Sequence, residues 1–542
     1  MADTDRPNTN LDRRNFLKML GAVGGTTAVF SALDSFGMSM ASAQDAPPDL
    51  SGRSDGTRVI VLGAGLAGMT AAYELSKLGY ETPILEARTF AGGRTQSARR
   101  GFSLTDVTGT TQRCLFDEGE YINHGPWRIP FHHRSTLHYC TKFGVPLEVM
   151  VNQNDNAYVL HDDIDGPFSG RRMRQREIKA DMRGHTAELL AKAADQDALD
   201  RELTADDKEQ LISYLVHEGY LDSEDLAYRG TSGRGYASNP GAGMNPGESS
   251  DPHGFLDLLR SGLGRTFRSI GAWNQQPTML QPVGGMDRIA KAFEREVGHM
   301  IRYGMEVQRI RQNDEGVTVE VENVRSGETY TIEGDYLINT IPLSVLNQID
   351  NGHSEEHRRA MGEVSYASTG KMGLQFSRRF WEEDDHIYGG HSVTNFAGNI
   401  SYPSYGFHKQ KGVLLGYYNF GGEAVRVSGM SHEDRVQYAL DIGERLHPGQ
   451  YRDAYETGFS VAWHLVPYSL GGWASWSGSA RQDAYPVLNE PDGRVYLAGE
   501  HLSYLTGWMA GGIESAWIQI EKLHRRAAQD EARAAVKGFA RA

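Results

Sequence analysis

The sequence contains only two cysteines, Cys114 and Cys140, among its 542 residues. A core of the size that this chain can form does not need a disulfide bridge, and the spacing leaves open whether the two cysteines pair. No group of cysteine and histidine residues has metal-ligand spacing, so we predict no metal site. The adjacent residues His132 and His133 are interpreted as surface or structural, because neighbouring side chains point apart on a helix or a strand.

Positive charge is also in short supply. The chain has 55 lysines and arginines against 70 aspartates and glutamates, which gives a formal net charge of −15 at pH 7. Binding to nucleic acid needs clustered cations, so we predict that nucleic acid is not a partner. A composition of 39% hydrophobic and 23% charged residues is typical of a globular protein, and the length predicts two to four domains.

The apolar stretch near the start, residues 19–33, is too short and too interrupted to span a membrane, so we predict no stable membrane anchor. Residues 12–18, DRRNFLK, resemble a twin-arginine export signal, and residues 41–43, ASA, fit a signal-peptidase site. We therefore interpret residues 1–43 as a signal peptide and residues 44–57 as a linker. The mature protein is then periplasmic or secreted. The alternative is a chance pair of arginines before a soluble helix.

The sequence does contain a strand–turn–helix–strand pattern over residues 58–86. Residues 59–62 are apolar and mostly β-branched, which is typical of a central parallel strand. Residues 66–78 carry apolar side chains at helical spacing, and residues 80–85 are interpreted as the next strand. This order, with a glycine turn before the helix, predicts a dinucleotide-binding unit.

Each glycine of the turn has a physical role in such a unit. Gly63 permits the tight turn, Gly65 lets a pyrophosphate approach the helix N-terminus, and Gly68 lets the helix pack closely on the strand. Glu86 follows eighteen residues after Gly68, where an acid accepts hydrogen bonds from the adenosine ribose hydroxyls.

Later segments continue the α/β pattern but are interrupted by a charged helical insertion and a β-rich stretch. We predict a mixed α/β fold of two or three domains woven from discontinuous segments. Residues 230–252 contain six glycines and three prolines and are interpreted as a lid, an entrance or a disordered surface insertion. The predicted boundaries are 58–96, 283–343 and 484–542 for the dinucleotide-binding domain, 97–165 and 344–483 for the substrate domain, and 166–282 for the helical domain.

Three motifs together make the sequence resemble the flavin-containing amine oxidase family over residues 58–527. The first is the glycine motif with Glu86, and the second is Gly-Gly-Arg at residues 92–94. The third is YLAGE at residues 496–500, followed by GWMAGGIESA at residues 507–516. The resemblance implies FAD as cofactor and a two-dinucleotide-binding-domain flavoprotein fold, with a Rossmann-like FAD-binding domain, a β-rich substrate domain and a helical insertion.

In the family these motifs surround FAD. The resemblance implies that the forked guanidinium of Arg94 holds the pyrophosphate and that Glu500 meets the ribitol-phosphate end. It also implies that the helix after Trp508 points at the flavin pyrimidine edge, where its dipole stabilises negative charge. The predicted FAD contacts are Gly63, Gly65, Gly68, Glu86, Ala87, Arg88, Gly93, Arg94, Gly125, Pro126, Trp127, Arg128, Val307, Gly499, Glu500, Gly507, Trp508 and Met509.

The segment YINHGPWR, residues 121–128, is similar to the L-amino acid oxidase branch of the family. In that branch an arginine after Gly-Pro-x meets the substrate carboxylate, so the resemblance implies this role for Arg128, shared with Tyr402. A carboxylate that enters a dry pocket has to be paired and hydrogen-bonded, and arginine offers a planar fork that keeps its charge.

Lys371 and Trp508 complete the predicted catalytic set with Arg128 and Tyr402. The resemblance implies that Lys371 binds a water beside flavin N5 and assists oxygen reduction, and that Gly507 and Trp508 contact the substrate. Oxidases of simple amines have a second aromatic wall after a Gly-Gly turn. Here the nearest match falls on Ala474 or Trp473, so we expect an incomplete aromatic cage.

We predict an FAD-dependent L-amino acid oxidase that passes a hydride to the flavin, consumes dioxygen and releases a 2-oxo acid, ammonium and hydrogen peroxide. The alternatives are a monoamine or polyamine oxidase of the same fold, an L-amino acid monooxygenase, or a flavin-bound protein without oxidase turnover. The family often forms homodimers, although the sequence specifies no interface. His124 is interpreted as structural. Bulky or aromatic substrates are favoured if tryptophans line the pocket, and at least two of these four are interpreted as core: Trp273, Trp463, Trp473 and Trp508.

Overall fold

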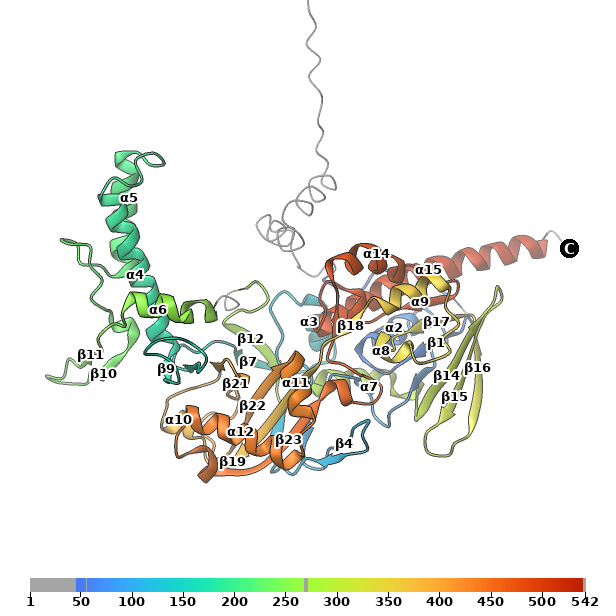
Figure 1. Cartoon of the computed structure of the whole chain (residues 1–542). Coiled ribbons are helices and arrows are strands. Elements are labelled where there is room, and N and C mark those ends of the chain that lie inside the picture. The colour runs from blue at the N-terminus through green and yellow to red at the C-terminus, as the bar shows by residue number, and fades with distance from the viewer. Residues whose placement is uncertain (1–44, 55, 268–271, 540–542) are drawn as a thin grey trace, which may run out of the picture.

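The computed structural model describes residues 45–54, 56–267 and 272–539, so the predicted signal peptide lies outside the described residues. Figure 1 shows a region built around a parallel sheet, a second region built around a larger sheet, and a helical arm that projects away from both. The mixed α/β class predicted from the sequence is confirmed. The exact domain boundaries stay a prediction.

The first region is a five-stranded parallel sheet with β1 (Val59–Leu62) at its centre. All four residues of β1 are buried, as expected for an apolar, β-branched strand between two covered faces. The glycine turn and helix α2 (Leu66–Ser76) follow directly. The strand order is β13 (Ile301–Tyr303), β2 (Ile84–Glu86), β1, β17 (Tyr336–Asn339) and β25 (Val495–Leu497).

The strand after α2 begins later than the sequence pattern predicts. A strand was expected over residues 80–85, but β2 covers only Ile84–Glu86, and Arg58 and Glu81 form an isolated bridge before it. Pro83 lies between them and has no backbone N–H to donate to a ladder, which accounts for the late start. Glu86 is the last residue of β2, which is where a ribose-binding acid is expected.

The two faces of this sheet are covered by different layers. Val59 and Val61 belong to a core that also contains residues of α2, α7 (Asp287–Val297) and the long C-terminal helix α15 (Met509–Phe539). Ile60 and Leu62 point to the opposite core, because alternate side chains of a strand face opposite ways. The elements on that side are β14 (Met305–Gln312), β15 (Val317–Asn323), β16 (Thr329–Gly334), α8 (Leu343–Leu346), α9 (Glu355–Gly362) and α14 (Gly478–Asn489).

The second region is a seven-stranded sheet that joins segments far apart in the sequence. Its order is β23 (Tyr455–Ala462), β19 (Thr369–Phe376), β22 (Gly412–Phe420), β21 (Gly398–Ser401), β20 (His391–Thr394), β8 (Tyr158–Leu160) and β9 (Met173–Arg174). Every residue of β19 is buried, although this strand is second from one edge of the sheet. The helices of this region are α10 (Phe380–Glu383), α11 (Gly421–Ser428), α12 (His432–Leu446) and α13 (Tyr451–Ala454).

The projecting arm contains α4 (Gln175–Asp195), α5 (Ala205–Gly219) and α6 (Phe255–Ser261). The Gly/Pro-rich segment predicted to lack structure lies along it and contains the hairpin β10 (Tyr236–Ser238) and β11 (Glu248–Ser249). A fully buried ion pair fixes the start of this segment to α4, with Arg234 Nε 2.5 Å from Asp181 Oδ1. The segment is therefore anchored to the arm and is not structureless.

Shorter elements connect these regions. Helix α3 (Arg134–Lys142) packs near α15. The two-stranded pairs are β7 (Leu147–Val151) with β12 (Thr278–Pro282), β3 (Ala98–Arg99) with β6 (Tyr121–Ile122), β4 (Ser103–Thr105) with β5 (Thr111–Arg113), and β18 (Ser365–Tyr366) with β24 (Ala474–Ser475).

The structure shows the state of the two cysteines and of the adjacent histidines. Cys114 and Cys140 are both free and buried, so they do not pair. His132 and His133 are not surface residues, because only 3% and 1% of each is exposed. They lie just before α3, where the chain is neither helix nor strand, so the alternation expected of regular elements does not apply. No helix in the described ranges is long and apolar enough to cross a membrane.

Candidate cofactor and substrate site

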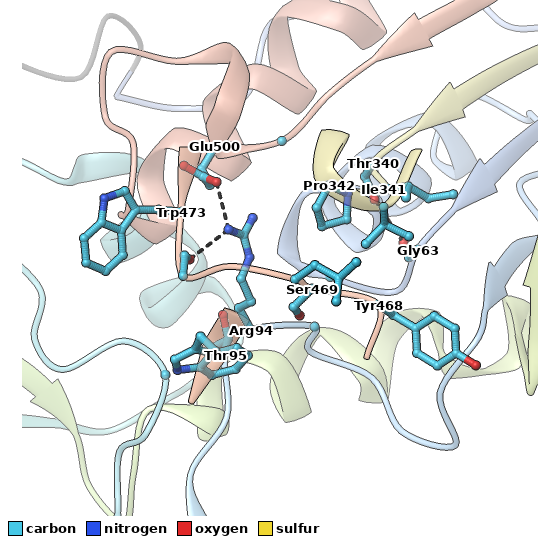
Figure 2. Close-up of a pocket in the computed structure, with 18 of the residues that line it drawn as sticks. Gly63, Arg94, Thr95, Thr340, Ile341, Pro342, Tyr468, Ser469, Trp473 and Glu500 are labelled. Atoms are coloured by element: carbon cyan, nitrogen blue, oxygen red, sulfur yellow. Dashed lines mark hydrogen bonds and ion pairs between the residues drawn. The ribbon is translucent and has the colours of Figure 1, made fainter. Parts of the chain in front are cut away.

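A cavity of about 840 Å³ opens at the carboxyl ends of the parallel strands and continues to β19 and β22 of the second sheet. Gly63, Glu86 and Thr340 line it just where β1, β2 and β17 end, and Lys371 and Tyr418 line it from β19 and β22. Figure 2 shows part of this lining. The crevice at the carboxyl ends of parallel strands is where open α/β sheets bind ligands.

The glycine turn after β1 forms an anion cradle at one end of the cavity. Gly63 has a φ of +95°, and a Cβ on Gly68 would lie 2.0 Å from the Gly63 carbonyl oxygen. A Cβ on Gly65 would meet nothing within 4 Å, so the space beside it is open. Helix α2 starts there with no side-chain cap and no acid in its first turn. Its N-terminal N–H groups therefore fit a pyrophosphate.

Glu86 closes the turn and faces the same cavity. Its carboxylate accepts hydrogen bonds from the backbone N–H of Ala64 at 2.7 Å and of Arg88 at 2.9 Å. Each oxygen of a carboxylate has two lone pairs, so both keep acceptor capacity for ribose hydroxyls. The position fits the role expected of the acid in a dinucleotide site.

Arg94 and Glu500 form an ion pair across the cavity, as Figure 2 shows. Arg94 Nη1 lies 2.8 Å from Glu500 Oε1 and donates to the Gly472 carbonyl at 2.9 Å. Glu500 also accepts from the backbone N–H of Ala474 at 3.1 Å and of Gly507 at 3.0 Å. The remaining N–H groups of the guanidinium suit a phosphate.

Most of the predicted cofactor residues are brought together by the fold. Gly68 does not line the cavity, because it is packed against the turn itself. The glycine cradle, the acid at the end of β2 and the volume of the cavity together fit FAD. The predicted contacts that line the cavity are Gly63, Gly65, Glu86, Ala87, Arg88, Gly93, Arg94, Gly125, Pro126, Trp127, Arg128, Val307, Gly499, Glu500, Gly507, Trp508 and Met509.

Two further parts of the lining were not predicted from sequence motifs, apart from Trp473 as a candidate wall residue. One is the segment 340–349 after β17, and the other is the loop 467–473 that lies along the cavity. Arg88 holds this loop by donating to the Pro467 carbonyl at 2.6 Å and to the Ser469 hydroxyl at 2.8 Å. Apart from the Gly-Gly turn at residues 471–472, neither segment has a local motif, because both act through their place in the fold.

Lys371 is a buried ammonium group with two backbone acceptors. Its side chain is 2% exposed, and Nζ donates to the Gly125 carbonyl at 2.6 Å and to the Asn123 carbonyl at 3.3 Å. Burial, together with the positive charge of Arg128, lowers the pKa of Lys371 to about 7. This group therefore changes protonation near neutral pH, which an ordinary lysine does not do.

Gly125 links the lysine to the cofactor end of the cavity. A Cβ at this position would lie 2.1 Å from the Arg94 carbonyl oxygen and 3.0 Å from the Gln96 nitrogen. Only glycine permits this approach, which also presents the Gly125 carbonyl to Lys371.

Arg128 is a cation without a charged partner among the described residues. Nη2 donates to the Gln275 side chain at 2.6 Å, and the guanidinium lies 5.7 Å from the Trp508 ring centroid. Its Nε is buried and has no hydrogen-bond partner in the described part of the chain, and no described carboxylate forms an ion pair with it. Burial lowers the pKa of Arg128. Such a group stays charged and attracts an anion.

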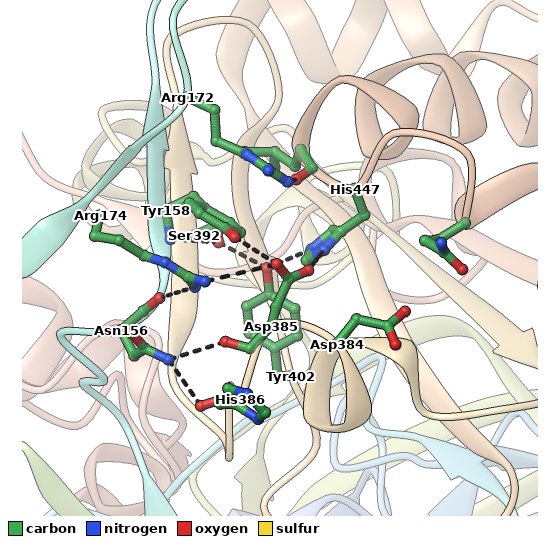
Figure 3. A network of polar contacts seen from close by, with 12 residues as sticks. Asn156, Tyr158, Arg172, Arg174, Asp384, Asp385, His386, Ser392, Tyr402 and His447 are labelled. Carbon is green, nitrogen blue, oxygen red and sulfur yellow. Dashed lines mark hydrogen bonds and ion pairs between the residues drawn. The ribbon is translucent and has the colours of Figure 1, made fainter. Parts of the chain in front are cut away.

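Tyr402 does not lie beside Arg128, which corrects the expectation that it shares the substrate carboxylate. Its side chain is fully buried outside the large cavity, and its hydroxyl contacts Ser392 Oγ at 2.7 Å and His447 Nε2 at 2.8 Å. His447 in turn contacts Asp385 at 2.5 Å, within the network of Figure 3. The hydroxyl is turned into this network because the polar partners lie there, so the residue is structural.

The aromatic lining is fuller than the sequence indicated. Trp473 lines the cavity beside Gly507, where a Cβ would lie 3.3 Å from the indole. Trp463 also lines the cavity, whereas Trp273 packs on His132 with ring centroids 5.5 Å apart. Three of the four tryptophans considered from the sequence therefore face the cavity.

His124 has a structural position. It stacks on Trp463 with ring centroids 5.7 Å apart and does not line the cavity. Burial, reinforced by the positive charge of Lys371, lowers the pKa of His124 to about 3. The ring is therefore neutral at ordinary pH, and a role as a proton acceptor is not favoured.

Comparisons with known proteins agree with this geometry. The family model described as flavin containing amine oxidoreductase matches residues 66–519. The putative L-amino-acid oxidase YobN of Bacillus subtilis is 28% identical over 467 residues, which cover 84% of this chain and 92% of that protein. The flavin-dependent L-tryptophan oxidase RebO of Lentzea aerocolonigenes is 29% identical over 508 residues, covering 86% and 98%.

Solved structures show the same fold at lower identity. The cyclohexylamine oxidase from Brevibacterium oxydans IH-35A superposes with a TM-score of 0.57 at 16% identity, covering 87% of this chain and 99% of that one. Putrescine oxidase bound to putrescine gives a TM-score of 0.56 at 16% identity, covering 88% and 99%. The flavoprotein amine oxidase fold expected from the sequence is therefore confirmed.

Proposed function

Because the chain belongs to the flavin-containing amine oxidoreductase family and FAD is its cofactor, we propose that it is an oxidase of L-amino acids. The products are a 2-oxo acid, ammonium and hydrogen peroxide. When bound, FAD supplies the two-electron chemistry, which takes a hydride from the substrate α-carbon and returns the electrons to dioxygen. The residues of the chain bind the substrate, orient it and control protons.

The unpaired charge of Arg128 carries this proposal. A half-buried guanidinium without a carboxylate is costly, and the cost is offset when the substrate brings the carboxylate. A simple amine has no such group and leaves Arg128 unpaired. Gln275 holds one side of the guanidinium, so the fork is oriented before the substrate arrives.

Lys371 is proposed to assist the oxygen-dependent half of the reaction. Nζ is held by two carbonyl groups, so its position is fixed while its proton remains exchangeable near pH 7. The positive form stabilises negative charge that develops on oxygen, and it can donate a proton there.

A second candidate is a monoamine or polyamine oxidase, and the position of Trp473 favours it. Trp473 and Trp508 both line the cavity, and aromatic side chains suit the binding of a neutral amine. An L-amino acid monooxygenase would share Arg128 and differ in its products, an amide and carbon dioxide.

The deciding experiment is a peroxide-coupled screen of the holoenzyme with the 20 L-amino acids, their decarboxylated counterparts, benzylamine and spermidine. We expect turnover of L-amino acids and little turnover of the matching amines. Equal or faster oxidation of the decarboxylated compounds would overturn the proposal in favour of the second candidate. Product analysis by mass spectrometry separates an oxidase from a monooxygenase.

We also propose that the protein is exported and that it forms a homodimer. The twin-arginine motif supports a periplasmic or secreted location of the folded, FAD-loaded protein. Cell fractionation of the native chain beside a variant with both Arg13 and Arg14 changed to Lys tests it, because only the native chain should leave the cytoplasm. A homodimer stays a prediction, to be checked by light scattering.

A further inference from the structure

We infer that Arg481 is a positioning residue that fixes the loop of residues 503–508, and through this loop the part of the cavity wall formed by Gly507 and Trp508. Arg481 lies on α14 and does not line the cavity itself. The inference rests on the proposed function only in taking Trp508 as part of the wall that the substrate meets. Whether Arg481 holds the loop can be measured without any substrate.

The loop 503–508 consists of bends and turns and leads directly into α15. Thr506, Gly507 and Trp508 line the cavity, and Gly507 is exposed with a φ of +80°. Glu500 holds the end of the loop by accepting a hydrogen bond from the Gly507 N–H at 3.0 Å. The position of this wall therefore also depends on what holds the start of the loop.

Arg481 holds the start of the loop by two contacts. Its Nη1 donates a hydrogen bond to the Ser503 carbonyl at 2.9 Å. Its guanidinium also lies 4.4 Å from the ring centroid of Tyr504, the next residue. Just before α14, the Trp476 indole donates to the His501 carbonyl at 3.0 Å. Two side chains at the beginning of α14 therefore hold two carbonyl groups that lead into the loop.

The surroundings of Arg481 are aromatic. The guanidinium lies 4.4 Å from the Tyr485 ring centroid and 5.0 Å from that of Trp476, in addition to its contact with Tyr504. No carboxylate in the described ranges forms an ion pair with it. A planar guanidinium can stack on rings and still donate within its own plane. One side chain can therefore contact the rings and the Ser503 carbonyl together.

The start of the loop is connected to Trp508 through the backbone. The Trp508 N–H donates to the Leu505 carbonyl at 3.2 Å, so a shift at the start of the loop is passed to this residue. The Trp508 ring contacts Arg128 at 5.7 Å and the His133 ring at 4.8 Å between centroids. Small displacements of a group that orients a substrate lower turnover strongly. Arg481 therefore acts on the reaction through Trp508.

Hydrogen exchange in the FAD-loaded protein tests the attachment directly. We expect the backbone amides of residues 503–508 to exchange about tenfold faster in Arg481→Ala, because the loop loses its attachment to α14. Arg481→Lys keeps the charge and a donor and should restore part of the protection. The control is Arg445→Ala, which removes a guanidinium 4.2 Å from the Phe396 ring centroid, in the second region. It should leave the exchange of the loop unchanged.

A double-mutant cycle tests whether the loop acts through Trp508. We expect Arg481→Ala to lower kcat/KM for the best L-amino acid by about tenfold. In a Trp508→Ala background the same change should lower it by less than about twofold, because the residue that is positioned is no longer present. Equal losses in both backgrounds would overturn the inference, since Arg481 would then contribute to stability alone.

The outcomes distinguish this inference from the proposed function. Native exchange of the loop in Arg481→Ala overturns the inference, whatever the substrate proves to be. If Arg481→Ala does not load FAD, Arg481→Lys decides: exchange at least about twofold faster than native supports the inference, and native exchange overturns it. If the native protein oxidises simple amines and no amino acid, the proposed function fails, and the cycle is measured with the best amine.

Discussion

The two ends of the cavity differ in whether their cationic side chains have a carboxylate partner. At the cofactor end, Arg94 is paired with Glu500, which is itself held by two backbone N–H groups. At the substrate end, Arg128 and Lys371 have neutral partners only, among the residues described. A cation that is paired within the chain contributes to the structure of the site. A cation without a carboxylate partner is instead stabilised when an anionic ligand binds. The difference therefore predicts that the negatively charged group of the substrate binds at the end that contains Arg128 and Lys371.

The largest expected effect comes from removing the unpaired cation. Arg128→Ala should lower kcat/KM for the best L-amino acid by about 10²–10³-fold, because a buried ion pair with the substrate is lost. Steady-state peroxide assays measure it, with the flavin spectrum as a check on loading. Arg134→Ala, which changes an exposed arginine paired weakly with Asp45 at 4.0 Å, is the control and should behave as native. Native-like turnover by Arg128→Ala would remove the basis of the comparison.

Breaking the paired cation should affect the cofactor instead of the substrate. Glu500→Gln leaves Arg94 without its carboxylate, and we expect FAD affinity to fall by about tenfold or more. Release of flavin fluorescence on dilution measures this affinity. Glu490→Gln, which alters an exposed pair with Lys522, is the matched control. If Glu500→Gln kept native FAD affinity but lost substrate binding, the assignment of the two ends would be reversed.

The protonation of Lys371 predicts a pH dependence for the reaction of the reduced flavin with dioxygen. Because its pKa is about 7, the ammonium form is present below pH 7 and is lost as the pH rises through that value. The rate at which dioxygen restores the flavin absorption should therefore fall above about pH 7, by roughly tenfold if the charge is used. Stopped-flow measurements across pH 5–9 test this on native protein and on Lys371→Met, which should lack the step. An identical pH profile in both proteins would assign the titration to another group.

The smallest effect is expected from the buried network of Figure 3. Tyr402→Phe leaves His447 Nε2 without its hydroxyl partner, so we expect a loss of stability of about 1 kcal/mol. Thermal unfolding of the holoenzyme measures this as a fall of a few degrees or less. A large loss of FAD or of amino acid turnover in this variant would show that the network reaches the cavity.

The cofactor end could be predicted from the sequence because its motifs are local. The turn at Gly63–Gly68 and the acid at Glu86 belong to one strand–helix–strand unit, so their spacing in sequence sets their spacing in the fold. Even there, the second strand starts late because Pro83 cannot join the ladder.

The substrate end could be predicted only in part. The position of Lys371 followed from the resemblance, but that of Tyr402 did not, because its hydroxyl contacts Ser392 and His447 outside the cavity. The direction of a side chain near a strand depends on register, and β22 carries an irregularity opposite Met372 and Gly373 that no local pattern reveals. The position of Trp473 could not be predicted from the sequence either, because only the folded loop brings it beside Gly507.

Gly125 sets a constraint on any attempt to redesign this enzyme. Its carbonyl holds Lys371, its missing side chain allows contact with the Arg94 backbone, and three residues later the same segment presents Arg128. Moving this segment to admit a larger metabolite would shift the lysine, both arginines and the flavin's support at once. Changes of specificity are therefore best sought in the aromatic side chains opposite, which can be exchanged one at a time.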